Sequence, residues 1–100
     1  MVIGVDVGTT AVKAVLLDER GVVRRASEQA HPLISQQPGY AEEDPEAWWS
    51  GVLRALRALT EGLDPAQVEA LGVSGMVPAL ILQRGGRPLR PSIQQNDARG

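Results

Sequence analysis

The segment DVGTT, residues 6–10, places a carboxylate, a glycine and two hydroxyls between two apolar runs of the chain. Carboxylate oxygens are ligands that Mg²⁺ prefers, so Asp6 can hold that ion directly or through water. Because Gly8 lacks a Cβ, a phosphate can approach the backbone there. Successive N–H groups through Gly8, Thr9 and Thr10 can form an anion-binding concavity, and Lys13 adds positive charge. These residues predict a phosphate site; the alternative is an ordinary hairpin turn with Lys13 exposed.

The elements around this segment are predicted to be strands. Val2–Val7 is an apolar run that predicts a strand buried on both faces, and Ala11–Leu17 is a second run of the same kind. Residues 18–21 form a turn, and residues 22–29 predict a third, more polar strand nearer an edge. Short turns between the three strands favour an antiparallel meander.

A helix is predicted to follow a loop at residues 30–43. Asp44 is the expected N-cap, Pro45 the first helical residue, and Gly62 the end. The helical spacing predicts a buried stripe of Trp48, Val52, Leu56 and Leu59, and a solvated face of Glu46, Ser50, Arg54, Arg57 and Glu61. The Trp48–Trp49 pair is interpreted as packing and helix anchoring. His31, in the loop, has no motif partner and is interpreted as a surface residue.

The last third of the chain predicts a further strand and a hairpin. Residues 65–69 form a turn or short helical segment, and residues 70–74 predict a strand that Gly75 ends. After a helix of that length, this strand is expected to lie parallel to a neighbour. Residues 79–83 and 87–89 flank RGGR, which is a strong hairpin signal. The tail PSIQQNDARG is polar.

Composition limits the class of protein. The 100 residues suffice for at most one small domain, and 43% hydrophobic residues suffice for a core. A net charge of −2 argues against nucleic-acid binding. The chain has no Cys, no basic-then-apolar leader and no apolar run of membrane-spanning length. We therefore expect a cytoplasmic protein that contacts neither nucleic acid nor membrane.

The ordered motifs resemble a known family. IGVDVGTTAVKAVLLDERG is similar to the first phosphate motif of the actin-like ATPase superfamily. PGYAEEDPEAWW, VEALGVSG and GRPLRPSIQQNDAR then resemble the start of the FGGY carbohydrate kinases, and the closest general pattern is that of xylulokinases. The resemblance covers nearly the whole chain. It implies an α/β, ribonuclease H-like half-domain: a three-strand antiparallel meander, then a helix, a parallel strand and a hairpin.

The resemblance also implies roles for residues. Asp6 would lie near Mg²⁺, while Gly8, Thr9, Thr10 and Lys13 would contact the phosphates of ATP. The segment after Gly75, which includes Met76, Val77 and Pro78, would line a sugar pocket. Gln95, Asp97 and Arg99 fall at or within the family's W-N-D-x-R pattern near that pocket.

Departures from the family pattern bear on the substrate. Xylulokinases tend to read SGQMHG where this chain reads SGMVPA, so Val77 and Pro78 replace a Met-His pair that touches the sugar. Pro78 in place of His removes both the hydrogen-bonding imidazole and the backbone N–H of that residue. Gln95 replaces the family's Trp. For Met76, Val77 and Pro78 the alternative is a strand-end turn with no ligand. The expected acceptor is a pentulose such as xylulose or a related sugar or polyol, and we hypothesise that it is not simply xylulose.

The resemblance implies that residues 1–100 are the N-terminal fragment of the first domain of an ATP-dependent sugar kinase. The family's catalytic Asp and the second, ATP-binding domain would lie beyond Gly100, so the fragment alone is expected to be inactive. Its partners would be the sugar or polyol and the remainder of the kinase chain. An open sheet edge makes a homo-oligomer possible. The alternatives are a non-kinase actin-like ATPase and a free-standing binding module.

Overall fold

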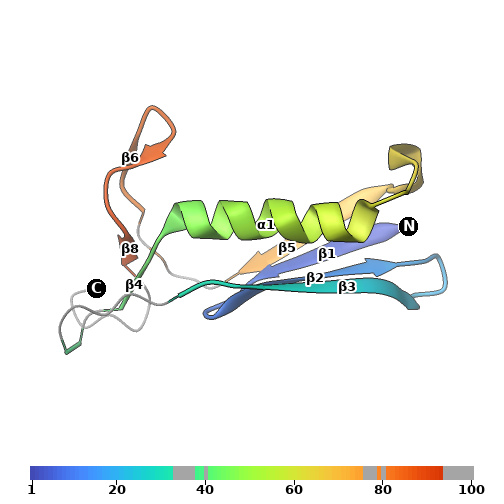
Figure 1. Cartoon of the computed structure of the whole chain (residues 1–100), viewed down its shortest axis with the longest axis horizontal. Coiled ribbons are helices and arrows are strands. Elements are labelled where there is room, and N and C mark those ends of the chain that lie inside the picture. The colour runs from blue at the N-terminus through green and yellow to red at the C-terminus, as the bar shows by residue number, and fades with distance from the viewer. Residues whose placement is uncertain (33–37, 40, 76–78, 80, 94–100) are drawn as a thin grey trace.

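A computed structural model describes residues 1–32, 38–39, 41–75, 79 and 81–93. One long helix covers one face of a four-stranded sheet, and two short strand pairs lie beyond the start of that helix (Figure 1). The chain measures 45 × 28 × 18 Å along its principal axes. The elongation follows from this arrangement, because the short strand pairs extend the molecule past the end of the sheet.

The sheet has the predicted topology. β1 (Val2–Val7), β2 (Ala11–Leu17) and β3 (Val23–Ala30) form an antiparallel meander, and β5 (Ala70–Gly75) lies parallel to β1. The strand order is therefore β3-β2-β1-β5. The helix between β3 and β5 supplies the crossover that a parallel pairing requires. The expected meander, helix and parallel strand are thus confirmed.

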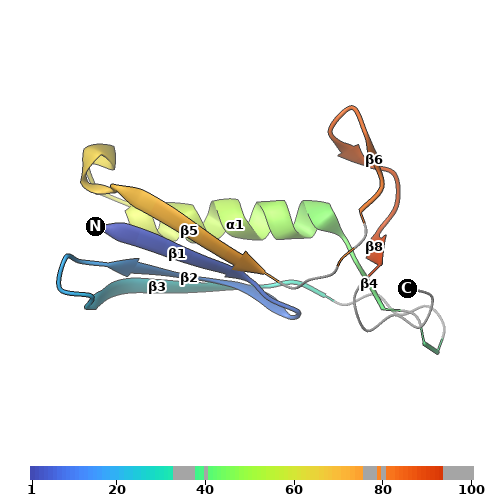
Figure 2. The same cartoon turned by 180° about the vertical axis from the view of Figure 1, so that it is seen from behind.

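β1 is buried on one face rather than on both, so that prediction is wrong. Ile3 and Val5 are buried against the helix, while Asp6 on the other face is exposed and Val2 is 37% exposed. Figure 2 shows this second face of the sheet without a covering element. Successive side chains of a strand point to opposite faces, so one helix can bury only alternate residues.

α1 (Pro45–Thr60) begins where the sequence predicts. The Asp44 side chain accepts a hydrogen bond from the Glu46 N–H at 3.0 Å, and Pro45 occupies the first turn. The helix ends before Gly62, which has a φ of 76°. Arg25 on β3 donates to the carbonyls of Leu59 (3.1 Å) and Glu61 (2.6 Å), which ties the C-terminal end of α1 to the sheet edge. The short helix η1 (Pro65–Gln67) follows.

The buried stripe of α1 is centred on smaller residues than predicted. Gly51, Ala55 and Leu59 are the buried members, and Val52 and Leu56 pack partly buried beside them. Trp48 is half-buried. Small residues face the sheet because α1 lies very close to β2. The five residues predicted for the solvated face are all exposed.

Two short strand pairs complete the described chain. β6 (Gln83–Arg84) and β7 (Arg87–Pro88) form the predicted hairpin, and Gly85 and Gly86 between them have φ of 58° and 77°. Two successive positive φ values are what the tight I′ hairpin turn requires. β4 (Glu42–Glu43) pairs antiparallel with β8 (Ser92–Ile93). β4 lies within the stretch predicted to be loop, so that prediction is wrong at these two residues. The sequence near β4 does not indicate a strand, because its partner β8 lies far along the chain.

The close approach of α1 to β2 gives a prediction on stability. A Cβ added at Gly51 would lie 3.1 Å from Val12 Cγ2, with Val12 itself fully buried. Gly51→Leu should therefore lower the free energy of unfolding by about 1–3 kcal/mol through overpacking. Ala58→Leu on the exposed side of the same helix is the matched control. Urea denaturation measures both variants, and equal stability of the two would contradict the close packing.

The turn between β2 and β3 is closed by a carboxylate. Asp18 Oδ1 accepts hydrogen bonds from the N–H groups of Val22 (3.0 Å) and Arg20 (2.9 Å), and Gly21 has a φ of 76°. The Val22 hydrogen bond is the main cause that lowers the pKa of Asp18 below its ordinary value of 3.8, and the Arg20 hydrogen bond and the Arg24 charge add to it.

The lowered pKa of Asp18 predicts a pH dependence. The folded chain holds this proton less tightly than the unfolded chain, so the stabilising effect is present above pH 3.8 and is lost as the pH falls from there through the folded-state pKa. Asp18→Asn should flatten this part of the stability–pH curve and leave the rest of the curve in place. Thermal unfolding at stepped pH tests it. If the variant loses stability below pH 3.8 as the wild type does, another group causes this part of the pH dependence.

Candidate functional site

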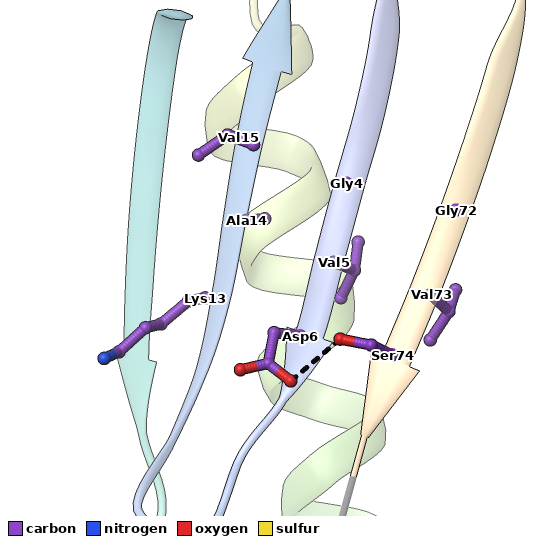
Figure 3. A pocket seen from close by; sticks show the side chains of 9 residues that line it. All are labelled: Gly4, Val5, Asp6, Lys13, Ala14, Val15, Gly72, Val73 and Ser74. Atoms are coloured by element: carbon purple, nitrogen blue, oxygen red, sulfur yellow. Dashed lines mark hydrogen bonds between the residues drawn. The ribbon is translucent and has the colours of Figure 1, made fainter.

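Asp6 lies near the C-terminal end of β1, between residues of both neighbouring strands. The register pairs it with Lys13 on β2 and with Ser74 on β5. The Ser74 hydroxyl donates to Asp6 Oδ1 at 3.0 Å (Figure 3). In the same view the amine of Lys13 points away from Asp6, toward β3. The exposed Asp6 carboxylate is therefore oriented by Ser74 while its second oxygen, Oδ2, remains a candidate metal ligand.

Gly8 lies where the chain turns sharply from β1 into β2. Its N–H donates to the Ala11 carbonyl at 2.9 Å. A Cβ at Gly8 would lie 3.1 Å from that carbonyl oxygen and 3.7 Å from Asp6 Oδ2. A side chain at Gly8 would therefore fit only if the turn shifted by a few tenths of an ångström. Since the Gly8 N–H is already bonded within the turn, it does not contribute a free donor to the concavity expected from the sequence.

Thr9 and Thr10 supply the unoccupied donors of this turn. Both residues are exposed, and within the described chain neither their N–H groups nor their hydroxyls donate a hydrogen bond. The Thr10 carbonyl is held by the His31 N–H at 2.9 Å. The backbone of the turn is thus fixed at Gly8 and Thr10, while its outward donors are available to an anion.

An open depression lies on the uncovered face of the sheet beside Asp6. Gly4 and Gly72 are register partners on β1 and β5, so no side chain fills the space above them (Figure 3). The depression has a volume of about 510 Å³, and Asp6, Lys13 and Ser74 are the polar residues among those that line it. The depression lies on the uncovered face of the sheet, over residues of β1, β2 and β5.

These residues fit a magnesium–phosphate group. Asp6 offers an exposed carboxylate oxygen, Thr9 and Thr10 offer free donors, and a side chain at Gly8 would fill the turn. Across the described residues, no group of three or more His, Asp or Glu side chains could hold a metal by itself. A metal at Asp6 would therefore share its remaining ligands with phosphate oxygens and water, which is usual for Mg²⁺.

Comparison with known proteins identifies the family. The model of the "FGGY family of carbohydrate kinases, N-terminal domain" matches residues 1–100. The chain belongs to this family. It is 41% identical over 100 residues to a xylulose kinase of Escherichia coli, a match that covers 99% of the chain and 21% of that protein.

Solved structures agree with this assignment. A xylulose kinase from Rhodospirillum rubrum matches with a TM-score of 0.84 and 38% identity. The match covers 95% of the chain and 20% of the length of that kinase. A gluconate kinase from Lactobacillus acidophilus matches with a TM-score of 0.85 and 35% identity, over 96% and 20%. The chain thus spans about a fifth of the length of these relatives, and its fold is that of the actin-like ATPase superfamily to which FGGY kinases belong.

The structure brings together only part of the predicted FGGY site. Asp6, Gly8, Thr9 and Thr10 lie at one end of the β1–β2 pair, and Lys13 shares the Asp6 face but points elsewhere. The predicted sugar-pocket residues fall outside the described residues; these are Met76, Val77, Pro78, Gln95, Asp97 and Arg99. Their roles stay predictions. No helix of the described chain is long and apolar enough to cross a membrane.

His31 is not a surface residue, and this prediction is wrong. It is 7% exposed, and its Nδ1 lies 2.7 Å from Oε1 of Glu43, itself 1% exposed. Trp48 Nε1 donates to the same Oε1 at 3.0 Å. Sequence reasoning missed the cluster because Pro32 and the polar loop suggested exposure. The acidic pair before the N-cap was the available signal, since a carboxylate next to the first helical turn can be buried against a tryptophan in that turn, here Trp48.

The position of Asp6 predicts its effect on nucleotide binding. Asp6→Asn removes the negative charge from the exposed oxygen without changing its shape. In the natural protein, it should weaken Mg²⁺-dependent ATP binding roughly 10- to 100-fold. Isothermal titration with and without Mg²⁺ measures this, with Asp18→Asn as a carboxylate control in a distant turn. Equal Mg²⁺-dependence in wild type and Asp6→Asn would exclude Asp6 from the metal site.

Proposed function

We propose that this chain is the N-terminal part of an ATP-dependent sugar kinase. The reaction would transfer the γ-phosphoryl group of ATP to a hydroxyl oxygen of the sugar, with ADP as the second product. The observation that carries the proposal is the combination of the exposed Asp6 carboxylate with the free donors of Thr9 and Thr10 at one end of the sheet. Family membership supplies the class of acceptor.

Each residue would have a limited role in this reaction. Asp6, oriented by Ser74, would hold Mg²⁺, and Thr9 and Thr10 would donate to phosphate oxygens. Bound Mg²⁺ supplies neutralisation of the charge on the phosphates. Lys13 would add a longer-range positive charge, because its amine points away from Asp6. The hydroxyl proton would pass to a base outside residues 1–100, so the chain alone should not catalyse transfer.

The proposed acceptor is a pentulose or a related sugar or polyol. Relatives carry the names xylulose kinase, gluconate kinase and apulose kinase, so similar chains serve different acceptors. Val77, Pro78 and Gln95 replace residues that xylulokinases tend to carry, and the replacements at Pro78 and Gln95 change hydrogen-bonding capacity. A site built to bond a hydroxyl discriminates strongly when that bond is lost. We therefore propose an acceptor other than D-xylulose alone.

ADP release from the natural-length protein tests the function. With ATP, Mg²⁺ and a panel of ketoses, sugar acids and polyols, ADP should be released only when the correct acceptor is present. Asp6→Asn should lower the rate of this release. A clear preference for D-xylulose would contradict the specificity proposal and leave kinase function intact. ADP release that no acceptor stimulates would favour a non-kinase ATPase of the same superfamily. Nucleotide binding without turnover would favour a binding module.

A further inference from the structure

A buried polar cluster lies where three elements meet. His31 directly follows β3, Glu43 ends β4, and Trp48 lies in the first turn of α1. The side chains of His31 and Glu43 are 3% and 1% exposed, and no other ion pair among the described residues is as buried on both sides. Glu43 Oε1 is shared by the Trp48 indole N–H at 3.0 Å and by His31 Nδ1 at 2.7 Å.

The cluster is a costly way to stabilise a fold. Neither imidazole nitrogen of His31 makes a hydrogen bond of standard geometry within the described chain, and Glu43 Oε2 also lacks a partner there. Each buried polar atom left in this state lowers stability, because it has lost its hydrogen bonds to water without gaining a partner. Replacing a buried charge pair with neutral side chains of similar volume is often neutral or stabilising. Residues that break the packing rules in this way tend to serve function.

The cluster is connected to the candidate phosphate site from two sides. The backbone N–H of His31 donates to the Thr10 carbonyl at 2.9 Å, so the position of His31 fixes the turn whose donors would meet phosphate. Trp48 lines a notch together with Val7 and Ser74. Ser74 in turn orients Asp6. Glu43 therefore contacts both His31, which holds the Gly8–Ala11 turn, and Trp48, which lies beside the Ser74 that orients Asp6.

We propose that His31 and Glu43, together with Trp48, are positioning residues that hold the Gly8–Ala11 turn against the start of α1 and so set the affinity for nucleotide phosphates. The proposal rests on the proposed function for its substrate. The imidazole and indole contact the same carboxylate oxygen, so a shift of either element would move the other.

Kinetics of the natural protein test the proposal, with a control variant that is destabilised far from the candidate site. In the double variant His31→Phe/Glu43→Gln a flat ring stays at residue 31 and a side chain of the size of glutamate stays at residue 43. The variant leaves an amide oxygen for Trp48, but it removes the imidazole–carboxylate contact. Its thermal midpoint should be unchanged or higher, while KM for ATP rises roughly 10- to 100-fold and KM for the sugar stays near wild type. Leu59→Ala, at the opposite end of α1, should lower the midpoint and leave both KM values unchanged. Leu59→Val replaces it if the alanine variant does not fold.

Two results would overturn the positioning role: a wild-type KM for ATP in the double variant, or an equal rise in Leu59→Ala. If wild type releases no ADP with any acceptor, the proposed function fails, and amide hydrogen exchange then decides the positioning role. The N–H groups of Gly8 and His31 should exchange roughly tenfold faster in the double variant, relative to amides in the β1–β2 ladder, because local opening of the turn becomes easier. Unchanged protection would refute the coupling.

Discussion

The central position of β1 is the constraint on which both the core and the candidate site depend. β1 is paired along one edge with β2 and along the other with β5, so its register is fixed twice. Ile3 and Val5 then face α1, and Asp6 faces the uncovered side with Lys13 and Ser74 as its register partners. A slip of one residue would bury Asp6 under the helix and expose both apolar residues. Burial of the core thus orients the carboxylate.

The second constraint is the height of α1 above the sheet. Gly51 and Ala55 let the helix axis approach β2, and Leu59 fills the far end, where Arg25 binds the last carbonyls. The near end is fixed by other means, because Trp48 bonds to Glu43 and is only half-buried. Apolar packing together with the Arg25 hydrogen bonds therefore fixes the far end of α1, and the hydrogen bond from Trp48 to Glu43 fixes the end near the Gly8–Ala11 turn.

Local patterns in the sequence predicted most of the fold. The bounds of β1 and β2, the Asp44 cap and the tight turn at Gly85 and Gly86 depend on neighbours in the chain, and they were correct. The candidate phosphate-binding residues could also be named from the sequence because DVGTT is contiguous, and their role stays a prediction. The burial of His31 and the β4–β8 pair were not predictable in the same way. Their partners lie 12 or more residues away, and only the folded chain brings them together.

The features that depend on neighbouring residues and the features that depend on distant residues lie at opposite ends of the molecule. The end near Leu16 and Leu59 is apolar and fully buried, and its contacts follow from hydrophobic periodicity. The end near Thr10 holds the buried polar groups, whose pairing is set by geometry rather than by composition. Polar networks specify one arrangement when their partners are satisfied, and they cost stability where they are not. His31 and Glu43 are incompletely bonded directly behind the Gly8–Ala11 turn, so this cost in stability lies beside the donors that we propose to bind phosphate.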